Sequence, residues 1–327
     1  MHLQGQVLDY AVTYFRIAVQ FSFFQAVTSS ISGIFRSYGK PKISVCVSLT
    51  MNGMNAVLAY LVIFRPIELP VSGVSGIAAA YVCSQLFGLL LILTFLRKIP
   101  LAAFQAKNFA SLKVAVTMLK VGIPGGISSI SYNLSQVSPP PSLPFTGCCH
   151  FHQNLCVQHC LLCICIRHEL GLSTSLMIGW LAGAGKYEQA YRLNLQNLKL
   201  TISANVMLSF LIFLLAEPLL GCFTTDPQII SMGRHLMLID ILVEIGRGFN
   251  HVEENSLRGA GDVVYPMAVS MISCWTMSIL FSYILGIRMG LGLTGCWIAF
   301  AMDEFFRGTA YLIRWRSRKW TTKTVAV

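Results

Sequence analysis

Charged side chains are scarce in this 327-residue chain. They make up 11% of the residues, against roughly 25% in an ordinary soluble domain. Acidic residues are the scarcest, with 13 Asp and Glu against 24 Lys and Arg. Hydrophobic residues account for 55% of the chain, and the mean hydropathy is +0.65. This balance excludes an ordinary soluble domain and predicts a protein that lies in a lipid bilayer.

The sequence also lacks the patterns of common catalytic and nucleotide-binding sites. AGAGK at residues 182–186 does not have the spacing of a phosphate-binding loop, and no predicted strand precedes it. No nucleophile and base stand in a catalytic arrangement. We therefore expect no enzymatic activity and no bound cofactor.

Long apolar stretches dominate what is present. A helix needs about 20 mostly apolar residues to cross roughly 30 Å of hydrocarbon, because its backbone polar groups must be satisfied internally. Eight stretches meet this requirement, and a ninth, Leu155–Leu181, is interrupted by polar residues. The sequence thus predicts an all-α polytopic membrane protein. The eight stretches are Leu8–Ile34, Ile43–Phe64, Ser72–Leu96, Val114–Val137, Leu198–Cys222, Ile229–His251, Val263–Ile287 and Leu291–Leu312.

The basic residues gather in alternate loops between these stretches. The positive-inside rule then places those loops and the C-terminus in the cytoplasm of a multi-pass protein of the plasma (inner) membrane. Because the cations are spread over five loops and form no single patch, we expect membrane lipids as partners and no nucleic acid. The residues concerned include Arg36, Lys40, Lys42, Arg97, Lys98, Lys107, Lys113, Lys186, Arg192, Arg258, Arg314, Arg316 and Lys319.

One motif occurs twice. Arg36 and Gly39 in IFRSYGKPK match Arg258 and Gly261 in LRGAGDVVYP at an offset of 222, and GVSG at 73–76 matches GLTG at 292–295 at an offset of 219. Repeats on this scale are typical of secondary transporters. Six predicted helices separate the two copies, so the repeating unit is six helices and the parent has twelve. About nine are predicted here, so we expect a truncated chain whose missing three helices belong before residue 1; a genuine nine-helix protein is the alternative.

Cysteine and histidine are concentrated in residues 148–168. Thiolates and imidazoles at such short spacings are ligands that zinc and copper sites use, so a membrane metal-binding protein is one alternative. We expect no metal, because the other helices offer no matching ligands. The low-ranked ligand candidates are Cys148, Cys149, His150, His152, Cys156 and His159.

A pair of compensating frameshifts would also explain this segment. Back-translated from Cys148 to Glu169 and shifted by one nucleotide, the segment can encode an apolar helix that continues into Gly171. A run of prolines just before it, at 139–141 and 144, interrupts the preceding helix. A third alternative is an unusual apolar loop with reduced cysteines.

Several motifs together resemble the multidrug and toxic compound extrusion (MATE) family of antiporters, bacterial type. They are FRSYGKPK with GVSGIAAAY, GWLAGAGKYEQA at 179–190, EIGRGFN with NSLRGAGD at 244–262, and GLGLTGCWIAFAMDEFFRG at 290–308. Residues 138–170 match nothing in the family pattern, which favours a frameshift there.

The resemblance implies two six-helix bundles around a cavity that opens to either side in turn, exchanging Na⁺ or H⁺ for small organic, often cationic, compounds. Residues 1–98 would then be the last three helices of the first bundle, 99–113 a cytoplasmic linker, 114–315 the second bundle and 316–327 a basic tail. We expect a monomer. The family's coupling aspartate lies in a first helix that this chain lacks, so an inactive fragment is one expected outcome.

Ionisable residues inside membrane helices are the candidates for ion coupling, because each costs roughly 2.5–3.5 kcal/mol on insertion scales. Asp240, Glu244 and Arg247 share one helical face by their spacing. We take Asp240 and Glu244 as candidates for coupling or substrate recognition, with Arg247 as their tuning partner. The alternative is an ion-paired stripe that fixes this helix to a neighbour.

Two further groups complete the candidate site. Asp303 and Glu304 form a second charged set with Arg307, whose spacing also allows pairing within their own helix. Gly122, Pro124 and Gly125 in VGIPGG are candidates for a gating bend, or for a helix start. A lipid-linked oligosaccharide flippase of the same superfamily remains an alternative, and it predicts a cavity rich in arginine.

Overall fold

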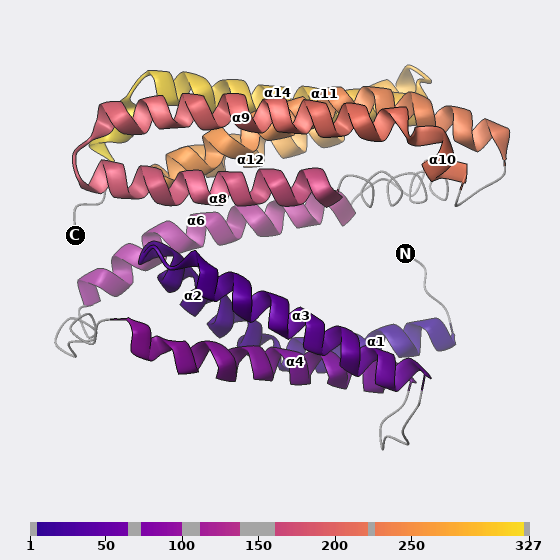
Figure 1. The fold of residues 1–327 in the computed structure, drawn as a ribbon. Coiled ribbons are helices and arrows are strands. Elements are labelled where there is room, and N and C mark those ends of the chain that lie inside the picture. The colour runs from indigo at the N-terminus through magenta and orange to yellow at the C-terminus, as the bar shows by residue number, and fades with distance from the viewer. Residues whose placement is uncertain (1–4, 65–72, 100–111, 138–160, 222–225, 324–327) are drawn as a thin grey trace. The chain divides into compact units, whose positions relative to one another are not determined.

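The computed structural model describes residues 5–64, 73–99, 112–137, 161–221 and 226–323, and the regular structure in these ranges is helical. The chain divides into two compact units, Met1–Ser111 and Leu112–Val327. Figure 1 shows each unit as a bundle of long helices.

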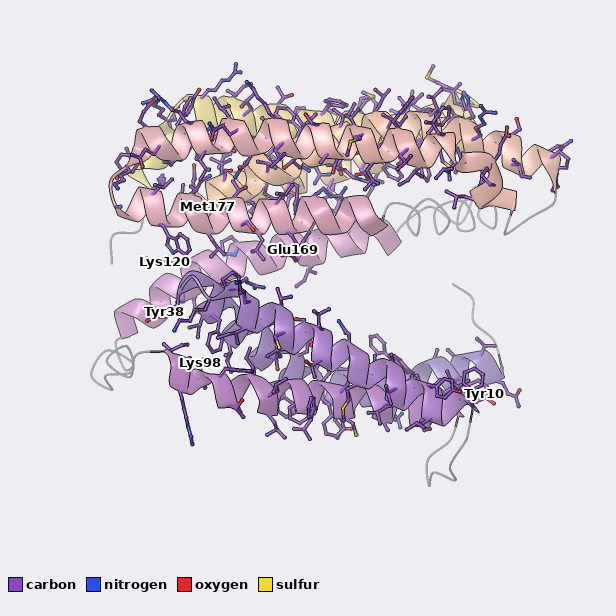
Figure 2. All side chains as sticks on the ribbon, in the orientation of Figure 1. Tyr10, Tyr38, Lys98, Lys120, Glu169 and Met177 are labelled. Atoms are coloured by element: carbon purple, nitrogen blue, oxygen red, sulfur yellow. The ribbon has the colours of Figure 1, made fainter. Side chains whose placement is uncertain are left out.

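The first unit contains a bent helix pair and two straight helices. The bent pair is α1 (Gln6–Gln20) and α2 (Ser22–Ser37), which meet at 47°. The straight helices α3 (Pro41–Phe64) and α4 (Gly73–Phe95) pack side by side. Tyr10 and Lys98 lie at opposite ends of this unit (Figure 2). Its buried core consists of Phe35, Val47, Ile92 and Ile99.

The second unit is built around α11 (Pro227–Gly259), which packs against α8 (Leu161–Gly183), α9 (Tyr187–Leu214) and α14 (Gly292–Arg316). Figure 1 shows α9, α11 and α14 running side by side. The other helical segments of this unit are α6 (Leu112–Val137), α10 (Ala216–Gly221), α12 (Val264–Ser273), the π-helical turns η3 (Cys274–Leu280) and η4 (Ile284–Arg288), α13 (Phe281–Tyr283) and the short η5 (Lys319–Thr322).

The predicted start of one helix is far too late, and another helix, α11, continues past its predicted end at His251 to Gly259. The stretch expected at Leu198–Cys222 is part of a helix that begins eleven residues earlier, at Tyr187, and ends at Leu214, with α10 following. Its first turns carry polar residues, among them Asn194, whose side chain is fully buried against α11. Hydropathy placed the start too late because these polar groups are satisfied by another helix and not by water.

Four helical segments within the described ranges are long and apolar enough to cross a membrane, and the bent pair of α1 and α2 would be a fifth. They are Pro41–Phe64, Gly73–Lys98, Tyr187–Leu214 and Val264–Arg288. Helices α11 and α14 are as long, at 33 and 25 residues, but they carry buried Asp, Glu and Arg. These two charged helices pack against each other in the second unit.

The repeated motif forms the same turn in both units. Gly39 (φ 69°) donates its backbone N–H to the carbonyl of Arg36, and Gly261 (φ 92°) donates to Arg258. The next residue donates at 2.9 Å in each copy, Lys40 N to the Phe35 oxygen and Asp262 N to the Leu257 oxygen. Positive φ is cheap only for glycine, which explains why both copies keep it.

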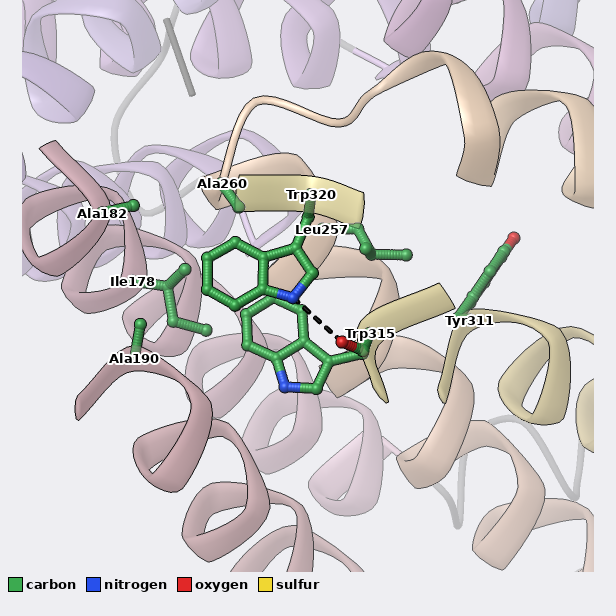
Figure 3. Close-up of a cluster of buried hydrophobic side chains, with 8 residues drawn as sticks. All are labelled: Ile178, Ala182, Ala190, Leu257, Ala260, Tyr311, Trp315 and Trp320. Carbon is green, nitrogen blue, oxygen red and sulfur yellow. Dashed lines mark hydrogen bonds between the residues drawn. The ribbon is translucent and has the colours of Figure 1, made fainter. Parts of the chain in front are cut away.

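The chain after α14 folds back onto the second unit. Trp320 stacks on Trp315 with ring centroids 4.2 Å apart, and its indole N–H donates to the Trp315 carbonyl oxygen at 3.0 Å (Figure 3). Both indoles are fully buried. Together with six neighbours they form a hydrophobic cluster at the end of α8, α11 and α14, here called the terminal cluster: Ile178, Ala182, Ala190, Leu257, Ala260, Tyr311, Trp315 and Trp320.

Candidate functional site

The carboxyl group of Glu244 lies between two arginines in the second unit. Arg167 of α8 approaches Glu244 Oε2 at 2.6 Å, and Arg247, one turn further along α11, approaches Oε1 at 2.7 Å. The Glu244 side chain has no exposed surface, whereas those of Arg167 and Arg247 are 12% and 26% exposed. The predicted pairing of Glu244 with Arg247 is confirmed, and an arginine from another helix joins it.

A second set of charges lies on α14. Arg307 approaches Asp303 Oδ2 at 2.6 Å and Glu304 Oε1 at 2.9 Å, so the pairing within this helix is also confirmed. Glu304 Oε2 accepts a hydrogen bond from the Asn250 amide of α11 at 2.6 Å. Asp303 Oδ1 accepts from the hydroxyl of Ser273, where α12 gives way to the π-helical turn η3. These contacts tie α14 to α11 and α12.

Arg247 connects the two sets. Its Nε lies 3.8 Å from Glu304 Oε1 while its Nη1 contacts Glu244. Gly246 allows this approach, since a Cβ there would lie 2.9 Å from the Cβ of Glu304. The result is one network of three arginines and three carboxylates that joins α8, α11 and α14 and has no net charge. Its members are Arg167, Glu244, Arg247, Glu304, Arg307 and Asp303.

Asp240 lies one turn before Glu244 on α11. Its Oδ1 accepts a hydrogen bond from the indole of Trp297 at 3.3 Å, and the Trp297 ring meets Phe300 edge-on at 5.8 Å. Asp240 is 7% exposed. A carboxylate beside aromatic rings is an arrangement that can recognise an organic cation.

The remaining predicted positions lie elsewhere. Gly122, Pro124 and Gly125 fall within the continuous helix α6, with Pro124 in its interior. Among the described residues, a Cβ at either glycine would meet nothing within 4 Å, so these residues show no close helix contact there. The Cys and His residues of the alternative metal site, 148–159, lie outside the described residues. In the ranges that the structure describes, no group of three or more His, Cys, Asp and Glu could hold a metal.

Three contributors to the buried polar interior were not predicted. Arg167 falls within the segment interpreted as aberrant, yet it forms the 2.6 Å ion pair with Glu244. Asn250 lies in the motif EIGRGFN and holds Glu304. Glu253 is fully buried near the end of α11. An intramembrane ionisable residue is a candidate by default, and this rule applied to Arg167 and Glu253 would have found both.

A model of the MatE family matches residues 1–61 and 155–284 of the chain. The expectation that residues 138–170 match nothing in the family is therefore wrong for residues 155–170. Within this part the structure describes α8 from Leu161 onward, and the nearly buried Arg167 is ion-paired with Glu244.

Two relatives illustrate the likeness. The uncharacterized transporter YisQ of Bacillus subtilis (strain 168) is 32% identical over 329 residues, which cover 100% of this chain and 72% of the relative. The probable multidrug resistance protein NorM of Thermotoga maritima is 26% identical over 333 residues, covering 99% of this chain and 70% of the relative.

Two solved structures show the same fold. A crystal structure of MATE in the bent conformation superimposes with a TM-score of 0.81 at 20% identity, covering 100% of this chain and 73% of the other. An outward-facing multidrug resistance MATE transporter of the MOP superfamily gives 0.83 at 18% identity, covering 97% and 71%. The predicted all-helical, MATE-like fold is confirmed.

Proposed function

Because the chain belongs to the MatE family of membrane transporters, we propose that it exports small organic compounds, aromatic cations among them, in exchange for Na⁺ or H⁺. It is a multi-pass membrane protein and a transporter, not an enzyme, as the sequence predicted. The naming of NorM relatives as probable multidrug resistance proteins supports organic compounds as cargo. We propose further that it acts as a monomer in the plasma (inner) membrane with its C-terminus in the cytoplasm.

The position of Arg247 between two carboxylates carries this proposal. One carboxylate, Glu244, lies on its own helix at 2.7 Å, and the other, Glu304, lies on α14 at 3.8 Å. An arginine with two such partners can exchange one for the other through a small movement. Each arrangement gives a different packing of α11 against α14, which makes this contact a two-state element.

A cation that binds at Glu244 would favour one of the two arrangements. A proton on Glu244 removes its charge, and Na⁺ there competes with the guanidinium groups for the carboxylate oxygens. In either case Arg247 shifts toward Glu304, and the ion pair of Arg167 with Glu244, which joins α8 to α11, is broken. Cation occupancy is thereby coupled to helix packing, as an antiporter requires, since a ligand shifts an equilibrium only through differential affinity for its states.

Asp240 supplies the charge that would recognise the substrate. It lies one turn from Glu244 and accepts from Trp297, whose indole packs in a hydrophobic cluster with Leu236 and Val243. A planar organic cation could contact the carboxylate and the aromatic ring together. Asp303 and Glu304 both pair with Arg307, and Glu304 also pairs with Arg247 when that arginine shifts. The role of these two carboxylates is therefore to position α14.

Ethidium export from cells that lack their own drug pumps tests the proposal. We expect Glu244→Gln to lose export driven by an ion gradient, because the neutral amide cannot take up and release a proton and offers Na⁺ no negative charge. The matched control is Glu217→Gln, which removes an ion pair with Arg234 whose two side chains are 63% and 53% exposed.

A second variant separates lost coupling from lost folding. Glu244→Gln combined with Arg167→Gln removes both charges of one pair, so it leaves no new unpaired arginine on α8. We expect this double variant to fold and still fail to export. Export by either Glu244 variant at the rate of the Glu217→Gln control, with equal amounts of folded protein, would refute the proposal.

The flippase alternative gains no support from the site. It requires arginines available for a negatively charged lipid headgroup. Arg167, Arg247 and Arg307 are each ion-paired with a carboxylate in a network of no net charge.

A further inference from the structure

A second acidic centre lies near the end of α11, away from the network. Both carboxylate oxygens of Glu253 accept from the side-chain amide of Asn194 on α9, at 3.1 Å each. The hydroxyl of Ser256 lies 2.8 Å from the amide oxygen of Asn194 and 2.7 Å from the carbonyl oxygen of Val252, and its single hydrogen can be donated to either. Glu253, Asn194 and Ser256 all have no exposed surface.

Glu253 differs from the carboxylates of the network in the partners it has. Among the described residues, no cationic side chain forms an ion pair with it, whereas Glu244, Asp303 and Glu304 each have an arginine. Two groups from the helices packed on α11 act on it: Asn194 of α9 by its hydrogen bond, and Arg316 of α14 by its charge, from beyond ion-pair distance. Both of these groups favour the ionised carboxylate, but burial without a close cation is the larger effect and favours a protonated Glu253.

The glycine turn that follows Glu253 does not need a carboxyl group at this position. In the first copy of the repeat, the residue at the same offset of 222 is Ile31, which packs against the core of the first unit. The glycine turns that follow make the same hydrogen bonds in both copies. An apolar side chain is therefore compatible with the turn, and the acid of the second copy differs from it by its contact with Asn194.

Glu253 lies where it could exchange a proton with the water on one side of the membrane. It lies one turn from Leu257, a member of the terminal cluster (Figure 3), where α11 and α14 end and α9 begins. Under the proposed topology this is the cytoplasmic end. The direct contact of the Asn194 nitrogen with both carboxylate oxygens leaves no space for Na⁺ between them, so the ligand this centre fits is a proton.

We propose that Glu253 is a second proton-carrying group of the transporter, positioned by Asn194 and Ser256. The proposal rests on the antiport function proposed above. When α9 and α11 separate, water reaches the carboxyl group, its O–H bond breaks and the proton passes to that water. The remaining carboxylate is hydrated and faces the charge of Arg316, and it regains the amide hydrogen bonds when the two helices close again. Uptake of a proton from water reverses the step.

Infrared spectroscopy of the purified full-length chain tests the proposal without relying on transport. Over a range of about pH 5 to 9, we expect wild-type protein to show the carbonyl-stretch band of a protonated carboxylic acid, which weakens as the pH rises. Glu253→Gln should lose this band, Glu253→Asp should keep one, and the exposed control Glu217→Gln should leave it unchanged. A band that survives in Glu253→Gln, or that does not titrate in wild type, would overturn the assignment.

Ethidium export then separates this inference from the proposed function. If Glu253 carries a proton, Glu253→Gln loses export driven by a pH gradient while it folds as wild type does. Export driven by Na⁺ alone with no titrating Glu253 band would overturn the inference and leave antiport intact. A titrating Glu253 band in a protein that exports nothing would support the proton site and refute the proposed function.

Discussion

Removing the charge of Glu244 should destabilise the second unit far more than removing both members of its pair with Arg167. The change Glu244→Gln keeps the size of the side chain and takes away its charge. Arg167 then remains nearly buried, with its side chain 12% exposed and its ion-pair partner gone. Arg247 is less affected, because it is 26% exposed and has Glu304 at 3.8 Å.

The size of the effect follows from this asymmetry. Breaking a buried ion pair by removing one partner costs about 3–5 kcal/mol, and half-exposed pairs contribute about 1 kcal/mol or less. The loss at Arg167 dominates, so we expect the free energy of unfolding to fall by about 3 kcal/mol. For a unit of this size that corresponds to a Tm lower by about 6–12 °C. Adding Arg167→Gln removes the stranded charge and should return stability to within about 1 kcal/mol of wild type.

Tryptophan fluorescence during thermal unfolding in detergent micelles measures this directly. All five tryptophans of the chain, at positions 180, 275, 297, 315 and 320, lie in the second unit, so the signal reports on the unit that holds the network. Wild type, the single variant and the double variant are compared under identical conditions. A single variant that melts with wild type, or a double variant no more stable than the single one, would refute the reasoning.

Two further predictions concern packing. Trp320→Ala removes a fully buried ring stacked on Trp315. Such a truncation lowers the free energy of unfolding by about 3–5 kcal/mol, so the terminal segment should detach. Trypsin should then cleave quickly at the basic residues beside it, and unchanged cleavage would contradict the packing. Gly308→Ala should lower stability by about 1–3 kcal/mol, since its Cβ would lie 2.5 Å from the Phe249 ring. The control Gly183→Ala, whose Cβ would meet nothing within 4 Å, should not lower it. Equal melting temperatures of the two alanine variants would count against the helix contact.

The membrane helices and the pairs within one helix could be predicted from local sequence. The spacing of Glu244 and Arg247, and of Asp303 and Arg307, determines pairs three and four residues apart, and both pairs are present. The repeated glycine motif likewise predicts matching landmarks, and the same turn occurs in both units.

Contacts between helices could not be predicted in this way. Arg167 reaches Glu244 across 77 positions of sequence, and no periodic pattern within one helix indicates which neighbour will supply a partner. The early start of α9 was missed for the same reason, because Asn194 is satisfied by Glu253 of α11, 59 positions away. Polar residues that pair across helices resemble loop residues when each helix is considered alone.

Reconstitution of the purified chain in liposomes tests the central claim most directly. Ethidium accumulation is followed after a pH gradient or a Na⁺ gradient of known size is imposed, with the membrane potential held at zero by a potassium ionophore. The account predicts accumulation against the ethidium gradient that stops when the driving ion gradient is dissipated, and that Glu244→Gln lacks. Ethidium movement that does not depend on either ion gradient, or that Glu244→Gln retains in full, would contradict this account.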